Sequence, residues 1–161
     1  MTTSPAHTLA GLVTGIHHHG LVVADLDQAV EFYSAELRFH EEFRVTNMGD
    51  LFQRTVGVPG ITCDLVQLRN ETADTRLELI RVHAVPAGLD PSLPVHVGVG
   101  HTAFLVTDIA AAVEATRRAG GEMLGEIVEF SEGPAAYLRS PGGIIFELEE
   151  PTTQEETGYR P

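Results

Sequence analysis

Two histidines and two glutamates recur at matching positions in the two halves of this chain. Residues 18–26 read HHGLVVADL and residues 101–109 read HTAFLVTDI, so each segment has a histidine first and an aspartate at the same distance after it. The two halves also end alike, because residues 77–79 read LEL and residues 146–148 read FEL. A repeat with His at its start and Glu at its end predicts two matching halves of one site.

The four repeated residues are His18, Glu78, His101 and Glu147, and their donor atoms suit a metal ion. Imidazole nitrogens and carboxylate oxygens without a thiolate favour one divalent ion such as Ni, Co, Zn, Mn or Fe. Four protein ligands on an octahedral ion would leave two positions for water or substrate. Such an ion can polarise a carbonyl group, and a carboxylate beside it can move a proton from the neighbouring carbon.

The elements that must position these residues follow the order β-α-β-β-β twice. Asp25 and Asp108 each read as a helix N-cap, because an apolar helical spacing follows each of them. Apolar runs separated by Gly, Pro and Asn predict the strands. We expect strands at 16–23, 39–47, 61–69 and 75–82 in the first unit, and a strand at 101–106, a helix at 109–119 and strands near 122–129, 135–139 and 144–149 in the second.

The length of 161 residues is typical of one domain. We expect a first module at about 15–83, a linker rich in Pro and Gly at about 84–99, and a second module at about 100–151. Residues 1–15 read as a loose lead-in and residues 152–161 as a polar tail.

Alternation along each strand predicts which side chains share a face. All four repeated residues lie opposite the apolar positions that a helix would cover, so they face whatever the sheet encloses. The small residues Gly20 and Ala103 follow the two histidines on that same face and leave room beside the imidazoles. His17 and His19 fall on the helix side of their strand, and we interpret them as structural or edge residues.

Several other residues are candidates for a pocket. Arg76 and Ile80 share the face of Glu78, whereas Met48, Phe52 and Gln53 lie in a stretch where substrate contacts are plausible. Tyr137 fits a core position as well as a pocket, and Cys63 is expected to be a buried small residue.

Composition restricts the function further. Hydrophobic residues make up 43% of the chain and charged residues 20%, as in a soluble globular protein. The formal net charge of −13 argues against nucleic acid and anionic membranes as partners. No lysine is present, which excludes a Schiff-base lysine and a P-loop lysine. The single cysteine fits a reducing compartment, so we expect a cytoplasmic protein.

At these repeated segments the chain resembles the vicinal-oxygen-chelate superfamily, which contains glyoxalases, bleomycin-resistance proteins and dioxygenases. Residues 16–33 resemble the opening of the first module of that superfamily, while residues 101–109 and 140–148 resemble the start and end of the second. The resemblance covers about residues 15–151. It implies an α+β fold in which two βαβββ modules form a cupped, mostly antiparallel eight-stranded sheet with the helices outside.

The resemblance also implies a ligand set and a range of activities. The family's ligands are the first-strand His and last-strand Glu of each module, which carry over onto His18, Glu78, His101 and Glu147. Members with all four ligands resemble glyoxalase I and methylmalonyl-CoA epimerase, which transfer protons beside a metal-bound carbonyl. Members with two His and one Glu include extradiol dioxygenases and thiol transferases, and some drug-binding members hold no metal.

We therefore expect a metal-dependent enzyme that isomerises or epimerises a small α-carbonyl compound, or that performs a glyoxalase-type lyase step. Glu147 or Glu78 would be the general base, and the sequence leaves that choice open. One alternative is a non-haem Fe(II) dioxygenase using His18, His101 and Glu147, with Glu78 a bystander. Another is a binding protein that sequesters a drug or metabolite in the cup. The expected partners are a small-molecule substrate and a second copy of the chain in a homodimer, and the two modules could pair within one chain or across two.

Overall fold

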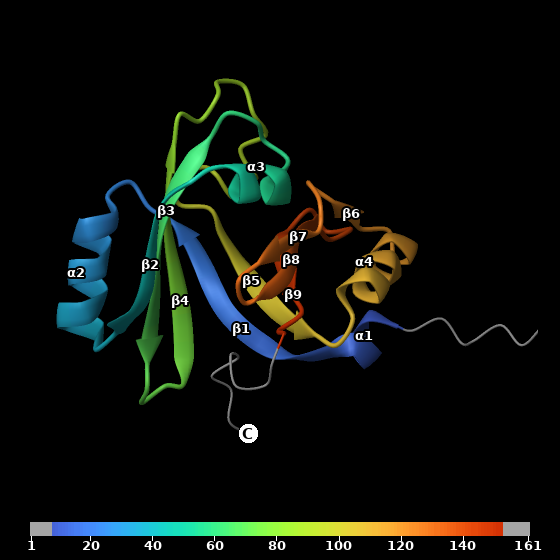
Figure 1. Ribbon diagram of the computed structural model, residues 1–161, viewed down its shortest axis with the longest axis horizontal. Coiled ribbons are helices and arrows are strands. Elements are labelled where there is room, and N and C mark those ends of the chain that lie inside the picture. The colour runs from blue at the N-terminus through green and yellow to red at the C-terminus, as the bar shows by residue number, and fades with distance from the viewer. Residues whose placement is uncertain (1–7, 153–161) are drawn as a thin grey trace, which may run out of the picture.

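The structure of the chain is a computed structural model, which describes residues 8–152. Its strands form one nine-stranded sheet in the order β2-β3-β4-β1-β5-β9-β8-β6, with β7 paired to β8 (Figure 1). The first unit contains β1 (Val13–Val22), α2 (Leu26–Leu37), β2 (His40–Met48), α3 (Asp50–Val56), β3 (Thr62–Asn70) and β4 (Thr75–His83), after a short helix α1 (Leu9–Leu12). The second contains β5 (Gly100–Val106), α4 (Ile109–Arg118), β6 (Glu122–Met123), β7 (Val128–Phe130), β8 (Gly133–Arg139) and β9 (Ile145–Glu149).

The expected α+β class and the repeated βαβββ order are confirmed, with three differences. Helix α1 lies within the expected lead-in, helix α3 forms in the stretch before residues 57–60, which the sequence predicts to be a turn, and β6 and β7 replace one strand at 122–129. The rest of the lead-in and the polar tail, residues 1–7 and 153–161, lie outside the described residues. Helix α3 forms because Phe52 and Val56 recur at helical spacing and are buried, while Gly57 ends the helix in the left-handed conformation with φ 73°. The strand is interrupted around Gly125, where an added Cβ would lie 2.0 Å from the carbonyl oxygen of Arg54 in α3.

The helices α2 and α4 cover the outer face of the sheet, one on each half (Figure 1). The side chains of Asp25 and Asp108 accept hydrogen bonds from the backbone N–H groups of Gln28 and Ala111, as expected for N-caps. Under α2, Leu26 packs against strand residues such as Leu79, and under α4, Val113 packs against strand residues such as Leu148. The apolar face of each half is therefore buried under its own helix, and the opposite face is left for the interior of the cup.

Helix α3 lies between the two halves of the sheet (Figure 1) and contacts β3 on one side and β7 and β8 on the other. It closes one end of the cup, so this helix is not outside the sheet. None of the helices between residues 8 and 152 is long and apolar enough to cross a membrane.

The two halves join through β1 and β5, which pair antiparallel within the single chain. This pairing aligns two rows of residues across the sheet. One row holds Glu78 on β4, Gly20 on β1 and His101 on β5. The other row holds His18 on β1, Ala103 on β5 and Glu147 on β9. Each row thus has a glutamate and a histidine at its ends and a small residue in the middle.

The small middle residues let the imidazoles lie across the sheet surface. A Cβ added to Gly20 would lie 1.9 Å from Cε1 of His101 and 2.4 Å from its Nε2, so the ring occupies the space that any side chain there would need. Ala103, the small residue of the other row, is fully buried. The spacing of the two rows therefore depends on these two small residues.

The first prediction concerns Gly20. The Gly20→Ala variant should force the His101 ring out of its position and destabilise the metal-free protein by about 1–3 kcal/mol, the usual cost of overpacking. The matched control is Gly15→Ala on the same strand, because no atom lies within 4 Å of an added Cβ there. Urea unfolding followed by circular dichroism measures both variants. Equal stability of the two variants would contradict the close packing of His101 on Gly20.

Candidate metal centre

Four side chains converge on one point inside the cup, and they are the four that the repeat predicted. His18, Glu78, His101 and Glu147 each offer one ligand atom, and these atoms all lie within 4.8 Å of one another. The Nε2 atoms of the two histidines are 3.2 Å apart. Oε2 of Glu147 is 3.1 Å from Nε2 of His101 and 3.4 Å from Nε2 of His18, whereas Oε1 of Glu78 is 3.6 Å from Nε2 of His18.

The cluster is buried, and two of its polar atoms have no hydrogen-bond partner among the described residues. His18 is 2% exposed, and His101 and Glu147 are each 6% exposed. Within residues 8–152, Oε2 of Glu147 and Nδ1 of His101 have no hydrogen-bond partner. Two carboxylates brought together inside a protein need a cation, because burying an uncompensated charge is costly. Two imidazoles and two carboxylates at this spacing fit a divalent metal ion.

The proton affinities of the cluster show how strongly it attracts positive charge. Burial lowers the pKa of His18, but Glu78, Glu147 and Glu149 outweigh that effect and raise the pKa to about 10. Burial raises the pKa of Glu147, but the two imidazoles outweigh it and lower the pKa to about 2. Burial raises the pKa of Glu78. Without a metal, the cluster therefore keeps a proton on His18 at neutral pH.

The position of His17 differs from the expectation that it faces the helix. A β-bulge lies between Ile16 and His18, because Ile16 pairs with Phe104 and His18 pairs with the adjacent Ala103. The extra residue on β1 is His17, and its side chain lines the cavity inside the cup. A bulge breaks the alternation of faces, so strict alternation gave the wrong side for this residue. His19 bonds Thr102 at an exposed position, but it lies on β1 between β4 and β5, so it is not an edge residue.

Glu149 joins His17 and His18 in an outer layer that the sequence analysis missed. Its carboxylate lies 3.4 Å from Nδ1 of His18 and 2.9 Å from Nδ1 of His17. The two Nδ1 atoms are 3.0 Å apart. A carboxylate behind the imidazole fixes its orientation, so that Nε2 faces the cluster. Alternation along β9 could have revealed Glu149, because it lies two residues after Glu147 on the same face.

Tyr137 and Gln67 complete the polar surroundings. Tyr137 on β8 is aligned with Glu147, and its hydroxyl is 3.4 Å from Nε2 of His101. Gln67 on β3 is aligned with Glu78, and its amide N–H donates to Glu42. Both residues are buried and line the cavity. Tyr137 therefore belongs to the pocket, and the strand registers, which sequence alone does not give, place Gln67 beside the cluster.

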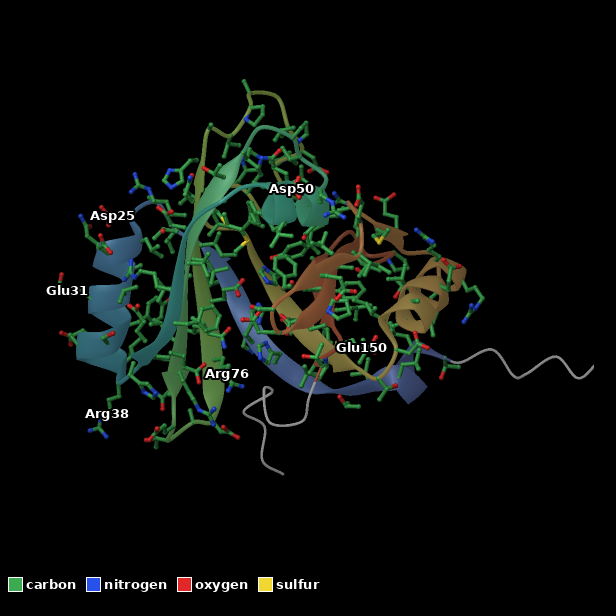
Figure 2. The ribbon with its side chains drawn as sticks, in the orientation of Figure 1. Asp25, Glu31, Arg38, Asp50, Arg76 and Glu150 are labelled. Atoms are coloured by element: carbon green, nitrogen blue, oxygen red, sulfur yellow. The ribbon has the colours of Figure 1, made fainter. Side chains whose placement is uncertain are left out.

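A cavity of about 320 Å³ opens beside the four residues. Glu78 and Glu147 line it, and most of its wall is apolar. The expected pocket residues Met48, Phe52 and Ile80 line the cavity, but Gln53 and Arg76 do not. Gln53 accepts a hydrogen bond from the backbone N–H of Gly60. Arg76, which is labelled in Figure 2, forms an ion pair with Glu42 on the first half of the sheet. Cys63 is fully buried in the apolar core as expected, and burial raises the pKa of its thiol to about 12.

Comparison with solved structures supports the fold. A methylmalonyl-CoA epimerase from Mycobacterium tuberculosis superposes with a TM-score of 0.64 at 24% identity, over 89% of this chain and 92% of that chain. A variant of the Streptomyces coelicolor methylmalonyl-CoA epimerase, in complex with 2-nitronate-propionyl-CoA, superposes with a TM-score of 0.57 at 22% identity, over 88% of this chain and 99% of that chain. At these identities the likeness concerns the fold alone.

Sequence comparison identifies a curated relative and a family. A 2-epi-5-epi-valiolone epimerase from Actinomyces sp is 28% identical over 141 residues, which are 83% of this chain and 77% of that protein. The family model of the Glyoxalase/Bleomycin resistance protein/Dioxygenase superfamily matches residues 15–148 of this chain. This match spans both halves of the sheet and all four clustered residues, and the chain belongs to that superfamily.

Proposed function

We propose that this protein is a metal-dependent epimerase or isomerase that moves a proton at the carbon next to a carbonyl group of a small molecule. The observation that carries this proposal is the pair of buried carboxylates, Glu78 and Glu147, which come from the two halves of the fold and both line the same cavity. The relative that is 28% identical to this chain is a 2-epi-5-epi-valiolone epimerase, which supports this reaction class.

In this proposal His18, Glu78, His101 and Glu147 hold one divalent ion, with Ni, Co, Zn, Mn and Fe as candidates. The bound ion would polarise a substrate carbonyl and so acidify the neighbouring C–H bond. The small residues Gly20 and Ala103 keep the surface between the ligands free of bulky side chains.

Glu78 is the better placed general base of the two carboxylates. Glu147 lies within 3.4 Å of both imidazoles, whereas the one imidazole contact of Glu78 among the described residues is 3.6 Å long. The looser carboxylate can leave the ion more easily and reach a substrate proton.

The reaction needs no electron donor or acceptor. Glu78 takes the proton when the C–H bond breaks, and in an epimerisation Glu147 or a water molecule returns a proton to the opposite face of the same carbon, so the substrate and product have the same composition. The apolar wall of the cavity, which includes Phe52 and Leu65, keeps bulk water from the acidified carbon. In such surroundings the electrostatic effect of the ligand cluster on the substrate is strengthened.

Glu149 provides a test of how His18 is positioned. The Glu149→Gln variant should lower the affinity for a divalent ion about 10–100-fold, the usual effect of removing a carboxylate behind a ligating histidine. Glu150→Gln is the matched control, because Glu150 also lines the cavity but bonds the backbone N–H of Ile109. Competition with a metallochromic chelator measures both affinities. An unchanged affinity in Glu149→Gln would show that the carboxylate does not orient His18.

Metal binding should release protons. At pH 7 the metal-free protein holds a proton on His18, whose pKa is raised to about 10, and that proton must leave before Nε2 can bind an ion. The apparent affinity should therefore rise about tenfold per pH unit between pH 7 and 9, with about one proton released per ion bound. Calorimetry in buffers of different ionisation enthalpy counts the protons.

The raised pKa of His18 also predicts that the folding stability of the metal-free protein falls as pH rises, whereas the metal affinity rises. Because the folded-state pKa of His18 lies above the unfolded value of 6.5, its contribution to stability is fully present below pH 6.5. That contribution is lost as pH rises through about 10, so the metal-free protein should become less stable over this range.

In the calorimetry experiment, proton release close to zero on metal binding at pH 7 would contradict the protonated state of His18.

The activity test follows deuterium incorporation in D₂O by NMR, with α-hydroxy ketones and acyl thioesters as candidate substrates. Zn, Co or Ni should support exchange at the α-carbon without oxygen. Glu78→Gln should reduce the rate about 10²–10⁴-fold, because the base is lost while the amide oxygen can still bind the ion. Glu147→Gln is the comparison that identifies the main base. Activity that requires both Fe(II) and oxygen and survives Glu78→Gln would contradict the proposal and favour a dioxygenase.

A further inference from the structure

The charges that line the cavity are nearly all negative. Five carboxylates contribute to its wall: Glu78, Glu132, Glu147, Glu149 and Glu150. The single basic side chain in the wall, as far as the structure describes the chain, is His17. No arginine between residues 8 and 152 lines the cavity, and the sequence contains no lysine.

A bound ion would not remove this excess of negative charge. A divalent ion offsets Glu78 and Glu147, and His17 lies 2.9 Å from Glu149. Two further carboxylates remain, the exposed Glu132 and the partly buried Glu150, and between residues 8 and 152 the hydrogen bonds that they accept come from uncharged donors. Glu132 accepts from the hydroxyl of Ser131, and Glu150 accepts from the backbone N–H of Ile109.

Arginines of the neighbouring elements are engaged elsewhere. Arg76 lies 2.8 Å from Glu42, Arg139 lies 2.9 Å from Asp90, and Arg54 lies 3.0 Å from Glu126. Each of these carboxylates lies outside the cavity wall. The cations that would recognise a carboxylate or phosphate are therefore held away from the cavity by other acidic groups.

The rest of the wall suits an apolar body. Beside the carboxylates lie Phe43, Val45, Met48, Leu51, Phe52 and Leu65. A volume of about 320 Å³ accommodates a small molecule. A substrate that fits this site has a carbonyl group at the ligand cluster, an apolar portion against these side chains, and no anionic group facing the carboxylates.

We propose that the substrate of this protein is an α-carbonyl compound whose portion inside the cavity carries no negative charge, either neutral or cationic, and that compounds with an anionic group inside the cavity are rejected. This inference rests on the proposed function, because it concerns the same cavity and the same reaction. Rejection arises from repulsion between like charges, which is stronger near the partly buried Glu149 and Glu150 than near the exposed Glu132.

The test uses three aryl α-hydroxy ketones that differ only at the para position, where they carry a carboxylate, a carboxamide or an aminomethyl group. The remote position keeps the variable group away from the metal ion. Calorimetry with the full-length, Zn-loaded protein measures Kd for each probe. The carboxamide and aminomethyl probes should bind at least about tenfold more tightly than the carboxylate probe, and added salt should reduce the difference.

Two variants test whether the preference for uncharged or cationic probes depends on a carboxylate of the cavity wall. Glu132→Gln should improve binding of the carboxylate probe about threefold or more relative to the carboxamide probe, because it removes one of the repelling charges. Glu129→Gln is the matched control, since Glu129 lies on the same hairpin but does not line the cavity. Equal or tighter binding of the carboxylate probe by the unmodified protein would overturn the inference, as would equal effects of the two variants.

Failure of the inference and failure of the proposed function give different results. If the charge preference holds but no probe exchanges its α-proton in D₂O, the ligand class stands and the epimerase proposal fails. If exchange occurs and the carboxylate probe is preferred, the reaction class stands and the inference about charge fails.

Discussion

The antiparallel pairing of β1 with β5 is the contact on which the rest of the structure depends. It aligns Gly20 with His101 and His18 with Ala103, and the parallel neighbours β4 and β9 then add Glu78 and Glu147 to the same two rows. Four residues that are far apart in the chain thereby meet within 4.8 Å. A shift of this register by one residue would turn the histidines to the opposite face of the sheet, because side chains alternate along a strand. The site is thus a consequence of how the two halves pair, rather than of any local motif.

This arrangement places charge where the fold alone would not favour it. His18 and His101 are buried with two carboxylates against an apolar cavity, so the metal-free site must keep a proton and leaves polar atoms without partners. A divalent ion would replace the proton and provide a partner for Oε2 of Glu147. In this account the apolar wall and the carboxylates of the cavity would then determine which small molecules can bind beside the ion. Binding of the metal, choice of base and rejection of anions would all follow from one concentration of negative charge inside the cup.

The sequence predicted the repeated order of elements and all four clustered residues, because the repeat fixes their positions and alternation fixes their faces. His17 was placed on the wrong side because a bulge in β1 interrupts that alternation, and a bulge depends on pairing with another strand. Helix α3 was missed because its seven residues are followed by glycines that also read as a turn. Gln67 could not be placed beside Glu78, since their proximity depends on the register of β3 and β4. Glu149, in contrast, was predictable from the alternation along β9 that already identified Glu147.

The central claim is that His18, Glu78, His101 and Glu147 hold one divalent ion. Anomalous diffraction at the metal absorption edge, from crystals of the metal-loaded protein, tests this claim directly. The account predicts a single peak at about 2.0–2.2 Å from Nε2 of both histidines and from one oxygen of each glutamate. His17, His18 and Glu149 form a second group of side chains that could hold an ion. A peak on that group through the Nδ1 atoms, or no peak at the four-residue cluster, would contradict the account.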